Sequence, residues 1–263
     1  MLIEKDKYCN MSYDFSNVFK EIEQTQKRIN SLMLPVLDTI AKLGEFIQPI
    51  LPVLQELSEK FKPMHAIKIM AENQFVFWDY MNMDFVEEII NAKNPNATLR
   101  KYFIIDDKNY IMNTIERTIN SSYLGENTKL YKQSIDAYWH KNYQLSITGL
   151  LAVSDQLLSD FSGNNSTSIF KRAQVIIEKA ECNIDIDDDE VSILALVMTF
   201  TDTVESLSTN MFPFDGKHPD KLNRHWIMHG RWKRNISQLD CVKIINFIYG
   251  IIAMHEYGEK ELV

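Results

Sequence analysis

Two apolar stretches near the C-terminus decide the fold class: VSILALVMTFTDTVESL, from Val191 to Leu207, and LDCVKIINFIYGIIAM, from Leu239 to Met254. Their apolar residues recur mostly at the threes and fours of an α-helix. The longest apolar stretches, such as Ile244 to Met254, are too short to cross a bilayer. We therefore expect two buried helices, at residues 187–207 and 239–257.

Helical spacing also covers most of the remaining chain, whereas alternating strand patterns and hairpin turn pairs are scarce. Further helices are expected at residues 84–92, 99–121, 128–141, 143–161 and 166–180, with loops at 94–96, 122–127, 162–165 and 212–219. The sequence predicts an all-α, multi-helix bundle. A soft boundary near Gly125 separates an N-terminal helical region, 1–124, from a C-terminal helical domain, 125–263.

The segment 15–61 has helical spacing interrupted by Pro35, Pro49 and Pro52, which predicts two or three pieces or one kinked helix. Its amphipathic faces are expected to pack on the protein, with a membrane-surface role as the alternative. The role of residues 1–124 stays open.

Length and cysteine content favour an intracellular protein whose stability needs no disulfide bond or structural metal ion. A chain of 263 residues can bury a sizeable core unaided. Its cysteines, Cys9, Cys182 and Cys241, lie far apart without metal-ligand spacing, which fits a reducing compartment. The charged N-terminus does not resemble a secretory signal. We expect a cytoplasmic protein with no metal, no other cofactor and no membrane partner.

Charge is distributed unevenly along the chain. The whole chain carries −8, but residues 217–234 carry +5, so a polyanion would be drawn to this basic window. An acidic string, DIDDDE at 185–190, lacks the glycine and the final glutamate of a calcium-binding loop and fits a helix N-terminus better.

The segment LNRHWIMHG, from Leu222 to Gly230, concentrates reactive side chains. On a helix, Arg224 and His229 would sit about 140° apart around the axis and His225 would share a face with His229. An imidazole can shuttle protons while a fixed guanidinium binds a phosphate. With the ribose 2′-hydroxyl as nucleophile, this set suffices for metal-free cleavage of RNA.

At this segment the sequence resembles the HEPN domains, in which an Arg, usually followed by Asn, Asp or His, precedes a His by four to six residues. Arg224, His225 and His229 match as Arg-His-x3-His, and Gly230 follows. The stretch AYWHKNYQLSI, from 137 to 147, and the acid in the next helix, Asp155, resemble the first two helices of such domains. The resemblance covers residues 127–258.

The resemblance implies a metal-independent endoribonuclease that forms a homodimer with two motifs in one cleft, acting in toxin-antitoxin or antiphage defence systems. By it, the catalytic residues would be Arg224, His229 and His225, with Asp155 orienting Arg224 or a histidine. An antitoxin or another protein would be a further partner. RNA contacts are expected from residues of the basic window, namely Asn223, Lys221, Arg231, Lys233 and Arg234.

Other interpretations remain open at this point. His225 and His229 could form half of a zinc site, although Arg224 would repel the cation. The motif could be coincidental in a helical structural protein, or the domain could be a non-catalytic scaffold that binds RNA, a nucleotide or a protein. Asp202 and Glu205, in an apolar helix, are rivals to Asp155 for pairing with Arg224.

Overall fold

The computed structural model describes residues 65–77, 83–105, 109–164, 166, 168–181, 190–208 and 218–259. The chain separates into two compact units, Met1–Phe61 and Lys62–Val263, and every described residue belongs to the second. The helices expected at residues 15–61, the acidic residues 185–189 and the basic residue Lys217 lie outside the described part.

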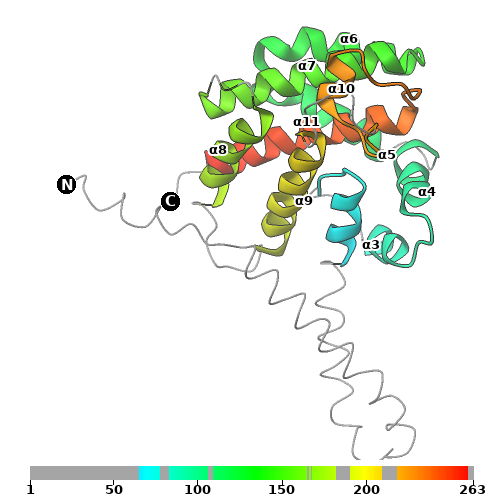
Figure 1. Ribbon diagram of the computed structural model, residues 1–263. Coiled ribbons are helices and arrows are strands. Elements are labelled where there is room, and N and C mark those ends of the chain that lie inside the picture. Colours follow the sequence, from blue (N-terminus) through cyan, green and yellow to red (C-terminus); the bar gives the residue numbers. More distant parts are fainter. Residues whose placement is uncertain are drawn as a thin grey trace, which may run out of the picture. The chain divides into compact units, whose positions relative to one another are not determined.

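Within the described ranges, every regular element is a helix and no strand occurs, which confirms the all-α class (Figure 1). After a helical segment at 65–72, the elements in chain order are α3 (Met83–Ile90), α4 (Pro95–Arg100), the π-helix η2 (Lys101–Ile105), α5 (Asn109–Asn120), the 3₁₀ helix η3 (Ser122–Asn127), α6 (Thr128–Trp139), α7 (Tyr143–Ser162), α8 (Ile169–Glu181), α9 (Glu190–Ser208), α10 (Arg224–Met228) and α11 (Gln238–Gly258). None of the helices in these ranges is long and apolar enough to span a membrane.

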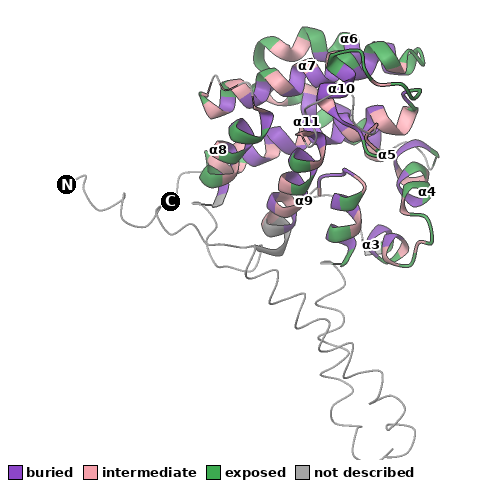
Figure 2. Cartoon of the chain, in the orientation of Figure 1, coloured by how far each residue is buried: buried purple, intermediate pink, exposed green. Residues whose placement is uncertain are grey.

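Helix α11 lies at the centre of the described unit and packs against α5, α7, α8 and α9 (Figures 1 and 2). Its start is fixed by a capping box in which Ser237 and Asp240 satisfy each other's backbone amides. Apolar residues then cover nearly all sides of the helix, and even Asn246 is buried. A helix that is apolar all round must be enclosed by its neighbours, which explains this position.

Helices α6 and α7 form an antiparallel pair joined by a tight turn. The backbone of Lys141 is left-handed, with φ of 61°, and the side chain of Asn142 caps α7 by accepting a hydrogen bond from Leu145 N at 3.3 Å. Gly149 lies against Ser134 of α6, where an added Cβ would come within 2.1 Å of Ser134 Oγ. The glycine therefore permits a close approach of the two helices.

The irregular segment 74–77, which begins with a left-handed backbone at Gln74, is held in place by side chains. Asn246 Oδ1 accepts from Val76 N at 2.7 Å, and its Nδ2 donates to Val76 O at 3.0 Å. Gln74 forms an equivalent pair with Leu222: its Oε1 accepts from Leu222 N at 2.9 Å and its Nε2 donates to Leu222 O at 2.8 Å. These amide clamps join the segment to α11 and to the residues that lead into α10.

The structure corrects two expected boundaries. The loop expected at 94–96 is the beginning of α4, because Asn94 accepts from Ala97 N at 3.3 Å and Pro95 occupies the first helical position, where its missing N–H costs nothing. The helix expected at 99–121 is divided: α4 continues into the π-helix η2, and α5 begins at Asn109. Within the described part, the other expected helices are present with ends shifted by a few residues, whereas the loop expected at 122–127 is the 3₁₀ helix η3.

Candidate functional site

The motif Arg-His-x3-His lies on the short helix α10 and its C-terminal end. Asn223 is the N-cap, and its side chain accepts a hydrogen bond from Trp226 N at 3.1 Å. His229 is the C-cap, and Gly230 follows with φ of 66°, a left-handed backbone that favours glycine. The helix is therefore shorter than the whole segment 222–230.

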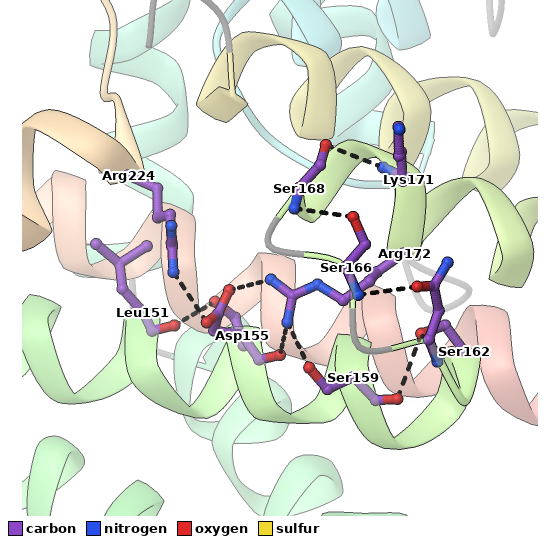
Figure 3. A network of polar contacts seen from close by, with 11 residues as sticks. Leu151, Asp155, Ser159, Ser162, Ser166, Ser168, Lys171, Arg172 and Arg224 are labelled. Atoms are coloured by element: carbon purple, nitrogen blue, oxygen red, sulfur yellow. Dashed lines mark hydrogen bonds and ion pairs between the residues drawn. The ribbon is translucent and has the colours of Figure 1, made fainter. Parts of the chain in front are cut away.

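Three helices contribute to one ionic cluster (Figure 3). Asp155 of α7 pairs through Oδ2 with Arg224 Nη2 of α10 at 2.9 Å, and through Oδ1 with Arg172 Nη2 of α8. Arg172 Nη1 also donates to the backbone oxygen of Asp155 at 2.9 Å and to Ser159 Oγ. One carboxylate thus lies between two guanidinium groups.

Burial differs among these three side chains. Exposure of the side chain is 5% for Arg172, 19% for Arg224 and 28% for Asp155. The cluster therefore opens toward solvent on the side of Arg224 and Asp155 and is closed behind Arg172. Arg224 Nε is itself buried and makes no hydrogen bond within the described part of the chain.

The two histidines of the motif lie against each other. The ring centroids of His225 and His229 are 4.3 Å apart, with 59° between the planes. His225 is 7% exposed, whereas His229 is exposed at the end of the helix. The pKa of His225 is lowered, first by burial and then by the nearby His229 and Arg224. A neutral imidazole is thus favoured at the inner position.

In the described part of the basic window, residues 218–234, hydrogen bonds join the loops on the two sides of α10. His218 Nδ1 lies 2.9 Å from Pro219 O, and its Nε2 accepts from Lys233 N at 3.2 Å. Arg234 Nη2 donates to Pro219 O at 2.7 Å and to Asp220 O at 2.8 Å, and its guanidinium lies 4.6 Å from the Trp232 ring. These contacts tie the residues before the motif to those after it.

The structure brings together several of the residues predicted for the site. Arg224 pairs with Asp155, and His225 contacts His229, so two of the expected associations are present. The rivals to Asp155 are placed differently from the expectation, because Asp202 and Glu205 are exposed on α9, although partial burial raises the pKa of Asp202.

Among the expected RNA contacts, Lys221, Arg231, Lys233 and Arg234 are exposed. Asn223 differs from this expectation, because it is only 2% exposed and its amide oxygen is engaged in capping α10. Its buried side chain therefore offers no surface for RNA, and the structure gives it a structural role.

Sequence reasoning did not identify Arg172. One signal was available: Ile169, Arg172 and Ile176 follow helical spacing and share the apolar stripe of α8, where a charged residue needs a partner. Gln74 was also missed, and its clamp on Leu222 has no recognisable sequence pattern.

A cavity of about 310 Å³ lies beside the basic window, lined by residues of the 72–74 turn, by Leu222, Trp232 and Arg234, and by Lys243 of α11. Neither Arg224 nor His229 lines it. Among the described residues no group of three or more His, Cys, Asp or Glu side chains could hold a metal ion.

Comparison of the chain with protein-family models, with curated proteins and with solved structures finds no match to any of them.

Proposed function

We propose that this protein is a metal-independent endoribonuclease of the HEPN type, with its active site at α10. The observation that supports the proposal is the pairing of Arg224 with Asp155 next to the contact of His229 with His225 on the same short helix. A guanidinium held in place and an exposed imidazole are the two groups that metal-free cleavage of a phosphodiester requires.

In the proposed mechanism, Arg224 binds the scissile phosphate and the charge that develops on it. His229 is the general base or acid: as a base it removes the proton of the ribose 2′-hydroxyl, whose oxygen attacks the adjacent phosphorus. The P–O5′ bond breaks, and the imidazolium of His229 then returns the proton to the leaving 5′-oxygen. The products carry a 2′,3′-cyclic phosphate and a 5′-hydroxyl. His225 assists from beneath His229, and Asp155 orients Arg224.

The partial exposure of Arg224 and the exposure of His229 also support a site completed by a second copy of the chain. In such a homodimer, two motifs would face one cleft, with Lys221, Arg231, Lys233 and Arg234 attracting the RNA. A role in phage defence or in a toxin-antitoxin system, with an antitoxin or partner protein, belongs to the same proposal.

The decisive experiment incubates the purified protein with tRNA and total RNA in EDTA. The native protein is expected to generate fragments with 2′,3′-cyclic phosphate ends. His229→Ala is expected to lose this cleavage by about 100-fold or more, the usual loss for a general acid or base. The matched control is His140→Ala, which removes an exposed histidine at the C-cap of α6, outside the site. Undiminished cleavage by His229→Ala would refute the assignment.

A second function is a non-catalytic scaffold that binds RNA, a nucleotide or a protein. One observation favours it: the side chain of Arg224 is mostly buried and already paired with a carboxylate, as in a structural ion pair. The same assay separates the two functions, because retention of RNA without cleavage, by the native protein and by His229→Ala alike, indicates a scaffold.

A further inference from the structure

Arg172 is a buried cation for which the proposed mechanism has no use. It is 4% exposed, and all the acceptors of its guanidinium described above lie on α7, at Asp155 and Ser159. A buried charge is costly unless it is paired, and replacing such a pair by apolar residues is often neutral or stabilising. Stability alone therefore gives a weak reason for an arginine here.

We infer that Arg172 is a positioning residue that sets both the orientation of Asp155 and the charge that Arg224 offers to a phosphate. Arg172 occupies Oδ1 and the backbone oxygen of Asp155, which leaves Oδ2 directed toward Arg224 (Figure 3). Because Arg172 is enclosed, it acts on RNA only through Asp155.

The charge balance of the cluster gives this arrangement a functional consequence. Arg224 with Asp155 alone would be a neutral pair, which attracts a phosphate weakly. Sharing the carboxylate with Arg172 leaves the three groups with one net positive charge, in a partly buried place where charge interactions are stronger than in water. The cation nearest solvent in the cluster is Arg224, so the surplus charge is presented there.

The connection between α7 and α8 holds Arg172 in place. Ser162 Oγ donates to Ser159 O at 3.3 Å and accepts from Asn164 N at 3.1 Å, and Ser166 N then donates to Asn164 Oδ1 at 2.8 Å. Ser168 N donates to Ser166 Oγ at 3.2 Å, one residue before α8 begins (Figure 3). The series of bonds starts at the backbone oxygen of Ser159, and the hydroxyl of the same serine accepts from Arg172. The start of α8 is therefore connected to the part of α7 that contains Asp155 and Ser159.

The inference rests on the proposed function, and its first test measures RNA binding. In the His229→Ala protein, which cannot cleave, the Kd for a short fluorescent RNA is measured by anisotropy. Arg172→Met is expected to weaken binding about tenfold, because Asp155 then neutralises the charge that Arg224 offers to the phosphate. Lys171→Met, which removes an exposed cation from the same turn of α8, is the matched control and is expected to leave the Kd unchanged.

Adding Asp155→Asn to Arg172→Met is expected to restore most of the affinity, because it removes the carboxylate that would otherwise neutralise Arg224. A purely structural role of Arg172 would give no such recovery. An unchanged Kd in Arg172→Met, or no recovery in the double variant, overturns the inference. If Arg172→Met does not fold, Arg172→Gln, which removes the charge but can still donate a hydrogen bond to Asp155, takes its place, with the same loss and the same recovery expected.

A second test needs no RNA and separates this inference from the proposed function. Urea midpoints are compared for Arg172→Met, Arg224→Met and the double variant. The double variant is expected to lose more than the sum of the single losses, because only then does Asp155 lack a cation. Additive losses overturn the inference. If the losses are non-additive but the native protein neither binds nor cleaves RNA, the proposed function fails and the coupling of Arg172 to Arg224 stands.

Discussion

The imidazole of His225 lies beneath that of His229, with the two ring centroids 4.3 Å apart, and only the outer ring is exposed. The inner ring is one of two histidines whose pKa is lowered by burial. The other is His255 of α11, where Lys179 lowers the pKa further, Glu259 opposes the shift, and the ring stacks on Phe161 with centroids 3.8 Å apart.

These two histidines predict that acid destabilises the fold. A lowered pKa means that each of these histidines binds the proton more tightly in the unfolded chain than in the folded one. Their contribution to stability is therefore fully present above pH 6.5, the ordinary histidine value, and decreases as the pH falls below it. The urea midpoint is therefore expected to decrease between pH 7.5 and 5.5. His255→Phe, which keeps the stacking on Phe161, should make that decrease smaller.

His225→Phe should reduce the decrease further when it is combined with His255→Phe. The matched control is His140→Phe, at the exposed C-cap position of α6. A slope that is the same in the native protein and in both buried-site variants would contradict the prediction.

The sequence was sufficient for the helices whose apolar spacing is long and continuous. Helices α7 and α11 were predicted to within a residue or two, because each has a clear cap at its start, Asn142 and Ser237. The start of α4 was missed because Asn94 and Pro95 suit a turn and a helix N-terminus equally well.

The candidate site could be predicted in part. The motif on α10 and its partner Asp155 were suggested by a family resemblance, whereas Arg172 and Gln74 depend on contacts between distant parts of the chain. A charged residue on an amphipathic helix is usually solvated, so only the position of Arg172 on the apolar stripe distinguishes it. The burial of Asn223 likewise follows from packing and not from its neighbours in sequence.

Asn223 is predicted to contribute through capping and not through RNA contact. Asn223→Ala should lower the free energy of unfolding by about 0.5–2 kcal/mol, the usual cost of a lost N-cap. Asn223→Ser keeps a capping oxygen but removes the amide, so it should retain most of the stability and, in the His229→Ala protein, the affinity for RNA. A Ser variant that is stable but binds RNA as weakly as the Ala variant would show that the amide contacts RNA.

Gln74 is predicted to be essential for the placement of α10. Gln74→Leu leaves the N–H and C=O of Leu222 without their partner in a buried place, where each lost bond costs about 1–3 kcal/mol. The urea midpoint and RNA cleavage should both decrease. Lys68→Ala, an exposed change in the preceding helical segment, should stay within about 0.5 kcal/mol of the native protein. Native stability in Gln74→Leu would show that the clamp contributes little.

Gly149 and Ser134 are predicted to be coupled across the α6–α7 contact. Gly149→Ala places a Cβ within 2.1 Å of Ser134 Oγ, so the hydroxyl must rotate away from Leu130 O, to which it now donates at 2.8 Å, or the helices must separate. The cost should be about 1–3 kcal/mol, as for other overpacked contacts. Thr148→Ala, at the exposed neighbouring position, is the control.

Ser134→Ala should relieve most of this cost, since the remaining Cβ contact of 3.3 Å needs an adjustment of only a few tenths of an ångström. In thermal or urea unfolding, the double variant Gly149→Ala with Ser134→Ala is therefore expected to be more stable than Gly149→Ala alone, although Ser134→Ala by itself loses a hydrogen bond. If the two substitutions instead add independently, the close approach of α6 and α7 at Gly149 does not depend on the serine hydroxyl, and the helices must move apart to admit the methyl group.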